Sequence, residues 1–178
     1  MEEKKLKSLR LIAMAIAVAG SAVLLGSLLL ECFTFTGTAG NTTVSMIDFI
    51  GIKLVTALGL VEISLVFSLL NFAVPQIMVG LFTGIWAGFI CREVIHGLTE
   101  TTGYLSVSFG LGMLLFIVSA CLILVSGILF AIVPGKFRGF GSAGERTALF
   151  KKIEVFCTVA MGLSIVLFCV LELVKIHR

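Results

Sequence analysis

The chain has 178 residues, of which 59% are hydrophobic and 13% are charged, and its mean hydropathy is +1.20. Charged residues make up about a quarter of an ordinary globular domain, so this composition excludes a soluble globular fold and indicates a lipid bilayer as the surroundings. The net charge of +3 does not indicate nucleic-acid binding, because the basic residues lie in short segments between apolar runs rather than on one soluble face.

The apolar runs predict an all-α integral membrane protein with one polytopic domain over residues 1–178. Each long run approaches or exceeds the roughly 20 residues that cross a hydrocarbon core as a helix. The runs lack the alternation of apolar and polar residues that membrane strands need. We expect a bundle of five transmembrane helices, at about residues 9–30, 49–70, 76–94, 104–133 and 153–174.

The first apolar run follows a basic start at residues 4–10. A secretory signal has the same order of segments, and Ala17-Val18-Ala19 resembles a cleavage site. The chain stays apolar for at least a further helical turn after these residues. We therefore interpret 9–30 as the first spanning helix.

The second long run covers residues 49–91, which is twice the length that one crossing needs. Asn71 and Pro75 lie near its middle, so we predict a helical hairpin that turns at 71–75, with the proline in the opening turn of the third helix. An alternative with four crossings treats 76–91 as a re-entrant segment. A further polar loop is predicted at residues 96–103.

The charges of the connecting segments predict the orientation. In the five-crossing topology the N-terminus, the 71–75 turn and the 134–152 segment share one side, which carries nine Lys or Arg residues against four acids. The other side carries four basic residues against five acids. Cytoplasmic loops hold the excess of Lys and Arg, so we expect a cytoplasmic N-terminus and a C-terminus on the opposite side. The four-crossing alternative places the basic 134–152 segment outside and ranks second.

Three glycines recur every four residues in the third predicted helix, at Gly80, Gly84 and Gly88. At about 100° per residue they lie nearly above one another, so they form a smooth stripe where a neighbouring backbone can approach closely. We predict a closely packed helix there, belonging either to this chain or to another protomer. Candidate facing pairs are Ser106/Gly110 and Ser108/Gly112 in the fourth helix and Gly51/Gly59 in the second.

Glu62 is the one acid inside the second predicted crossing. At 1.5 Å per residue it lies about 20 Å into a hydrocarbon core of about 30 Å, where an ionised acid is costly. One hypothesis is an ion or proton site, and the other is a protonated acid that hydrogen-bonds a neighbouring helix.

A second polar stripe lies on the opposite face of the same helix and contains Lys53, Thr56, Ser64 and Asn71. It predicts either a polar path through the membrane or ordinary interhelical packing, since Ser and Thr often satisfy backbone carbonyls within membrane helices.

Cys32 and Cys91 fall at the outer ends of the first and third predicted helices. They would form a disulfide if that side is oxidising and their Cα atoms lie within about 7 Å. The other cysteines are interpreted as small apolar packing residues.

The 135–152 segment is basic and rich in glycine, and it precedes a predicted helix start. Its letters match Gly-x-Gly-x-x-Gly at 139–144, but a dinucleotide site needs a preceding strand, which is not predicted here. Lys136, Arg138 and Arg146 are candidate contacts for anionic lipid headgroups, with an ordinary positive cytoplasmic loop as the alternative.

The sequence shows no catalytic set and no familiar zinc spacing, so we expect neither an enzyme nor a bound cofactor or metal. The first hypothesis is an integral membrane protein that acts by helix packing, as an accessory or assembly subunit of a membrane complex or as a homo-oligomer. The alternative is a small transporter or channel component that uses Glu62. A membrane enzyme acting on lipid at 135–152 lacks an acid, a base and a nucleophile.

Overall fold

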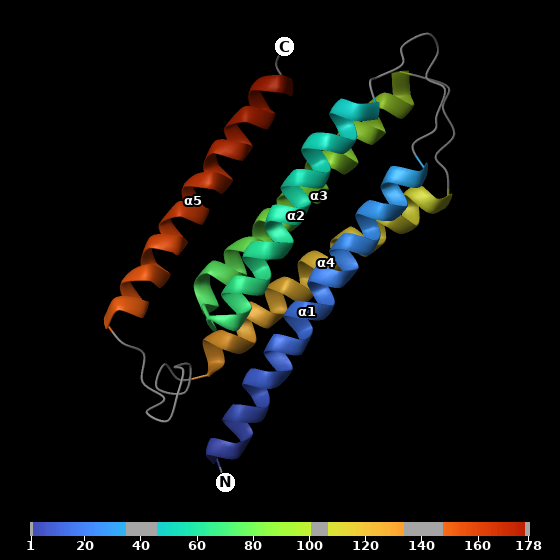
Figure 1. Cartoon of the computed structure of the whole chain (residues 1–178). Helices are drawn as coiled ribbons and strands as arrows, with labels where there is room; N and C mark the ends of the chain where they lie inside the picture. The colour runs from blue at the N-terminus through green and yellow to red at the C-terminus, as the bar shows by residue number, and fades with distance from the viewer. Residues whose placement is uncertain (1, 35–45, 101–106, 134–147, 177–178) are drawn as a thin grey trace.

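The computed structural model describes residues 2–34, 46–100, 107–133 and 148–176, and their side chains over 4–27, 55–92, 111–133 and 148–174. The described residues form five α-helices, α1 (Glu2–Thr34), α2 (Met46–Leu69), α3 (Ala73–Glu100), α4 (Val107–Ile132) and α5 (Ala148–Ile176). Figure 1 shows long helices that run side by side and alternate in direction, with the two termini at opposite ends of the bundle.

Four ranges of the described residues are long and apolar enough to cross a membrane: Lys4–Ser27, Ala73–Arg92, Leu111–Ile132 and Ala148–Val174. The described apolar part of α2, Val55–Leu69, is shorter. The protein is therefore an all-helical integral membrane protein over its described residues, as predicted. α3 is one continuous helix of 28 residues, which does not fit a re-entrant segment at 76–91.

Several helices extend beyond the predicted apolar runs. α1 begins at Glu2 instead of residue 9, and α3 continues to Glu100 instead of stopping near residue 94. The predicted loop at 96–103 is therefore wrong for residues 96–100. Hydropathy reports where the apolar surface of a helix stops, whereas good helix formers such as Glu, Lys and Leu carry the helix further.

α4 is the helix on which most of the bundle is assembled. It packs against α1, α3 and α2, while α2 also contacts α1 and α3. Buried apolar side chains fill the space between these four helices, among them Leu24, Val79, Phe116 and Ile123.

α5 lies to one side of the other four helices (Figure 1) and packs against α3. Three of the contacts on this helix are aromatic: Phe168 touches Phe82 and Phe89 of α3, with ring centroids 5.0 and 5.7 Å apart, and Phe150 touches Phe72 at 6.3 Å. Among the described side chains of α5, only Met161 is buried.

The turn between α2 and α3 covers residues 70–72, two residues fewer than the predicted 71–75 turn, because α3 already begins at Ala73. Asn71 has a φ of 55°, in the left-handed region that Asn tolerates better than most residues. The N–H of Phe72 donates to the carbonyl of Phe67 at 2.9 Å, and that of Asn71 donates to Ser68 at 3.1 Å. These two bonds and the contact between the Phe67 and Phe72 rings, 6.0 Å apart, form a Schellman helix end.

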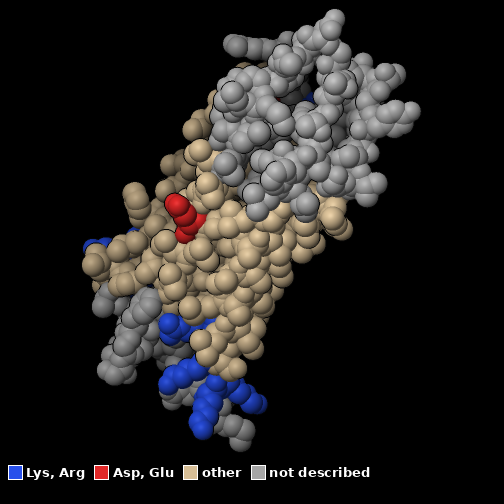
Figure 2. Space-filling view, turned by 45° about the vertical axis from the view of Figure 1, so that its right-hand side comes forward, with Lys and Arg blue, Asp and Glu red and all other residues tan. Residues whose placement is uncertain are grey.

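Basic side chains gather at the end of the bundle that holds this turn. Lys4, Lys5 and Lys7 are exposed at the start of α1, and Lys151 and Lys152 are exposed at the start of α5. Figure 2 shows Lys and Arg side chains at the end where α1 begins. The basic residues at the starts of α1 and α5, on which the predicted orientation depends, thus lie at the same end of the bundle. That this end is cytoplasmic stays a prediction.

Candidate functional site

The glycine stripe of α3 meets α4 at one point, and that point is Gly80. A Cβ atom placed on Gly80 would lie 2.7 Å from the backbone nitrogen and 2.8 Å from the Cα atom of Leu124. Gly127 of α4 is the reciprocal partner, because a Cβ there would lie 2.7 Å from the backbone nitrogen of Ile77. The two helices therefore approach backbone to backbone, and side chains larger than hydrogen do not fit at either glycine.

The partner of Gly80 is a helix of the same chain. The facing surface was expected in the fourth helix at Ser106/Gly110 or Ser108/Gly112, or in the second helix at Gly51/Gly59. The observed contact is instead with Leu124 and Gly127, several turns further along α4. A Cβ on Gly59 would meet nothing within 4 Å. The four-residue spacing predicts a stripe but carries no information on the depth at which the neighbouring helix crosses it.

Gly84 and Gly88 lie outside this close contact. Both are exposed; a Cβ on Gly84 would be 3.9 Å from Ala120, and one on Gly88 would meet nothing within 4 Å. Trp86, between them, faces inward and packs edge-on against Phe116, with ring centroids 5.3 Å apart.

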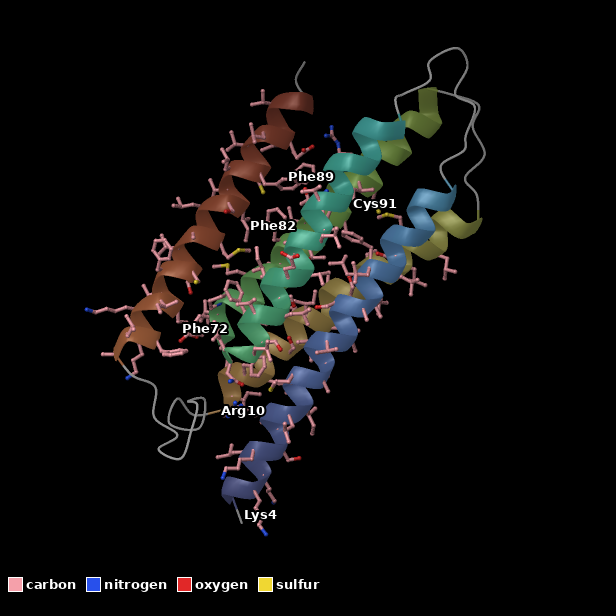
Figure 3. All side chains as sticks on the ribbon, in the orientation of Figure 1. Lys4, Arg10, Phe72, Phe82, Phe89 and Cys91 are labelled. Atoms are coloured by element: carbon pink, nitrogen blue, oxygen red, sulfur yellow. The ribbon has the colours of Figure 1, made fainter. Side chains whose placement is uncertain are left out.

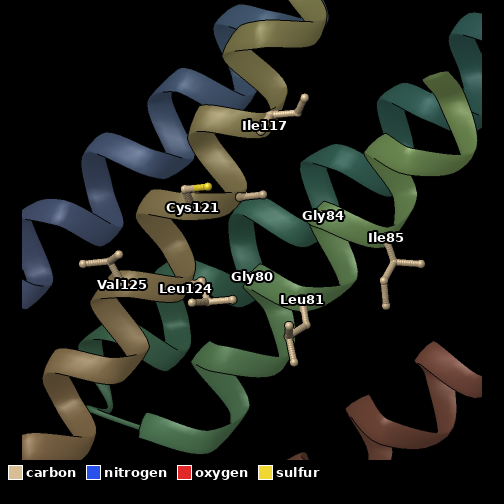
Figure 4. A pocket seen from close by; sticks show the side chains of 9 residues that line it. Gly80, Leu81, Gly84, Ile85, Ile117, Cys121, Leu124 and Val125 are labelled. Atoms are coloured by element: carbon tan, nitrogen blue, oxygen red, sulfur yellow. The ribbon is translucent and has the colours of Figure 1, made fainter.

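An apolar groove of about 460 Å³ opens on the outer surface where α3 and α4 diverge. Figure 4 shows that α3 forms one wall and α4 the other, with Gly80 and Gly84 on the α3 side and Ile117, Cys121 and Leu124 on the α4 side. Gly84 keeps the groove wide, because it presents no side chain to it. Gly84 and Gly88 of the glycine stripe thus face outward, away from the core of the bundle.

A chain of hydrogen bonds joins four helices in the buried core. The Gln76 Nε2 group of α3 donates to Ser64 of α2 at 3.0 Å and to Ser126 of α4 at 3.2 Å. The Ser21 hydroxyl of α1 donates to Ser64 at 3.3 Å. All four side chains are at most 2% exposed. Polar contacts of this kind fix the depth at which membrane helices pack, because sliding one helix would leave buried polar groups without partners.

Sequence reasoning found Ser64 but missed the other three members of this polar cluster. Ser126 donates its own proton to the Ile123 carbonyl at 2.6 Å and therefore accepts from Gln76. Gln76 Oε1 is buried and has no hydrogen-bond partner among the described residues. The available signal was Gln76 itself, one turn inside α3, since an amide so deep in an apolar run needs partners on neighbouring helices.

Small residues along α1 are a second feature that sequence reasoning missed. Ala13, Ala17 and Ser21 recur every four residues and are buried. A Cβ on the adjacent Gly20 would lie 3.0 Å from the side chains of Leu122 and Ile123 of α4. This spacing is the same small-residue signal that marked α3, and the adjacent Gly20 approaches α4 closely, as Gly80 of α3 does.

The described members of the predicted polar path lie in different surroundings. Ser64 belongs to the closed polar cluster, Thr56 is half-buried, and Asn71 lies in the α2–α3 turn. The side chain of Lys53 falls outside the described residues.

Asn71 instead joins the turn to α1. Arg10 Nε donates to Asn71 Oδ1 at 2.8 Å, and the Asn71 amide donates to the Leu69 carbonyl at 3.2 Å. On the other side of the turn, the N–H of Ala73 donates to the Glu154 carboxylate of α5 at 3.1 Å, which supplies an acidic cap at the N-terminus of α3. Figure 3 shows Arg10 and Phe72 at this end of the bundle.

Glu62 is exposed on the outer face of α2. It is separated from the buried Ser64 by two residues, or about 200° around the helix, so the acid and the polar cluster face opposite directions. The acid therefore does not line a shared path with Ser64 in the described bundle.

The remaining predicted residues lie wholly or partly outside the description. Cys91 is half-buried in α3 (Figure 3), but the side chain of Cys32 is not described, so their disulfide stays a prediction. The lipid-contact candidates Lys136, Arg138 and Arg146 also lie outside the described residues. Within the described ranges, no group of three or more His, Cys, Asp or Glu residues is placed to hold a metal ion.

Comparisons of this chain with protein-family models, with curated proteins and with solved structures find no match.

Proposed function

We propose that this protein is a non-enzymatic integral membrane protein that acts by helix packing, as an accessory or assembly subunit of a membrane complex. The observation that carries the proposal is the divided use of the glycine stripe. Gly80 is buried in the contact with α4. Gly84 and Gly88 are exposed on the outer surface of the packed described helices. Small residues on an exposed membrane helix allow another backbone to approach closely.

The groove beside Gly84 supports the same proposal. Its walls are apolar side chains of α3 and α4, and its volume of about 460 Å³ accommodates several side chains of a neighbouring helix. A homo-oligomer would use the same surface. It is distinguished from a subunit of a larger complex because only copies of this chain would copurify.

The proposal is tested by enlarging the open glycines without disturbing the core. The full-length protein is purified from its native membrane in mild detergent, and the mass of the complex is compared between the wild type, Gly84→Leu and Gly88→Leu. The expected result is loss of the partner subunits, or of the oligomer, with the protein still folded as judged by its thermal transition.

Leu81→Ala provides the matched control, because Leu81 lines the same groove but its shortening leaves room for a partner. A wild-type protein that is a monomer in every mild detergent tested would refute the proposal.

The alternative, a small transporter or channel component, would use Glu62. The geometry supports this alternative less than helix packing, because Glu62 and Ser64 face opposite directions and do not line one path. Proton or ion flux in liposomes that is abolished by Glu62→Gln, with assembly unchanged, would favour transport over packing.

A further inference from the structure

Glu62 lies at the centre of an exposed stripe on α2 that has the spacing of a helix-pairing seam. The stripe consists of Val55, Gly59, Glu62, Val66 and Leu69, at alternating intervals of four and three residues, and all of them except the half-buried Gly59 are exposed. Val55, Val66 and Leu69 are 70, 48 and 56% exposed. This alternation keeps one line of side chains facing a partner helix in left-handed packing, which is the usual crossing in membrane bundles.

The acid is deep in the apolar part of the bundle. It precedes Asn71 by nine residues, or about 13 Å along the helix axis. The Asn71 side chain accepts a hydrogen bond from Arg10, and the backbone N–H of Ala73 donates one to Glu154. The charged end of the bundle is therefore at the level of the α2–α3 turn. Glu62 is thus too far from this end for its short side chain to reach the interface.

No hydrogen bond or ion pair joins Glu62 to another residue in the part of the chain that the structure describes. An intramembrane acid that faces lipid is costly, and such groups normally pair with each other, with a base or with backbone carbonyls. The outer face of α2 therefore has both the shape and the chemistry of an incomplete helix contact.

We propose that this face binds a transmembrane helix of a different protein that carries a Lys or Arg at the depth of Glu62. The inference rests on the proposed function as a subunit of a membrane complex and names the chemistry of the partner. A second copy of this chain does not supply the cation at this depth. Residues 11–52, 54–91 and 153–174 contain no Lys or Arg, neither does α4, and Lys53 is nine residues, or about 13 Å along α2, from Glu62. Gly59, one turn before Glu62, has open space around it and lets the partner backbone approach beside the acid.

This surface is distinct from the glycine groove. The groove is lined by α3 and α4, whereas the Glu62 stripe belongs to α2. Substitutions at the two surfaces therefore separate the general proposal of a subunit from the specific proposal of a basic partner helix.

The test uses designed probe helices and the full-length chain in phosphatidylcholine vesicles. Each probe is an apolar Leu/Ala helix of about 20 residues. Three probes differ only in one residue, with Lys at the centre, Leu at the centre, or Lys moved two turns towards one end. Binding is measured by energy transfer between a donor on the protein and an acceptor on the probe, at several protein-to-lipid ratios.

The expected result is that the Lys-centred probe binds about tenfold more tightly than the Leu-centred probe, the change typical of one strong polar contact in a membrane. Glu62→Gln removes most of this preference, and Gly59→Leu weakens binding of the Lys-centred probe. Glu62→Lys reverses the preference, so that a probe with a central Glu binds best. Leu114→Gln, a polar substitution on the exposed face of α4, leaves the preference unchanged.

Equal binding of the Lys-centred and Leu-centred probes to the wild-type protein would overturn the inference. It would also be overturned if labelled copies of the chain associated with one another and Glu62→Gln dispersed them, because the occupant would then be a second copy with a shared proton between two acids. The two proposals can also be separated. If the native complex persists in Glu62→Gln and is lost in Gly84→Leu, and the probes bind equally, this inference is wrong and the proposed function is still supported.

Discussion

Replacing Gly80 with alanine tests the closest helix contact in the molecule. The added Cβ would lie 2.7 Å from the Leu124 nitrogen and 2.8 Å from its Cα and Cβ atoms, whereas ordinary contacts begin at 3.4 Å. Helices α3 and α4 must therefore separate by at least about 0.7 Å, because the obstructing atoms belong mainly to the backbone and no side-chain rotation relieves the clash.

The expected loss of stability follows from two opposing terms. Overpacking a tight contact costs about 1–3 kcal/mol. Alanine has a higher helix propensity than glycine, which offsets up to about 1 kcal/mol. We expect Gly80→Ala to lower the free energy of unfolding by about 1–2 kcal/mol. The measurement is reversible unfolding by sodium dodecyl sulfate in mixed micelles, followed by circular dichroism and tryptophan fluorescence.

Gly88→Ala is the matched control, because it adds the same methyl group on the same helix and meets nothing within 4 Å. Its unfolding free energy should be unchanged or slightly increased. If Gly80→Ala and Gly88→Ala are equally stable, the backbone contact between α3 and α4 does not exist in the membrane and the reasoning fails.

Three further outcomes are expected. Asn71→Gly should cost less unfolding free energy than Asn71→Ala in the same assay, because both lose the Arg10 hydrogen bond but only alanine is strained at a φ of 55°; equal losses would contradict the Schellman end. Gln76→Met should change stability by less than about 1.5 kcal/mol, while Gln76→Ala should cost about 2–4 kcal/mol through the cavity it leaves, as measured by the same unfolding curves; a larger loss in the Met variant would show that the polar cluster, not the volume, stabilises this layer. With the native cysteines replaced, a membrane-impermeant thiol reagent applied to intact cells should modify cysteines at positions 40 and 99 but not one at 140, and labelling at 140 would reverse the predicted orientation.

The helices themselves could be predicted because each one depends on local composition. Apolar runs long enough to cross a bilayer, interrupted near Asn71 and Pro75, predict the helices and the hairpin. The start of α1 was placed too late and the end of α3 too early, since the charged residues beyond the apolar runs still favour helix.

The site could be predicted only as a set of candidates. The spacing of Gly80, Gly84 and Gly88 identifies a face of α3, but whether each glycine meets a neighbour depends on where α4 crosses that face, which is a property of the whole bundle. Gln76 was predicted only as the first residue of the third helix, so its hydrogen bonds to three other helices, direct and through Ser64, were not anticipated. Glu62 lies within the apolar Val55–Leu69 part of α2, but its outward direction depends on which face of α2 the other helices cover.

The α2–α3 turn also has a consequence for the order in which the chain is assembled during synthesis. The N–H groups of Asn71 and Phe72 are satisfied within the hairpin, so α2 and α3 can enter the bilayer together as a closed unit. The N–H of Ala73 is different, because its acceptor is Glu154 of α5, which is translated some eighty residues later. The carboxylate that completes the start of α3 therefore arrives with the last helix, and the docking of α5 is the step that finishes the polar network at this end of the bundle.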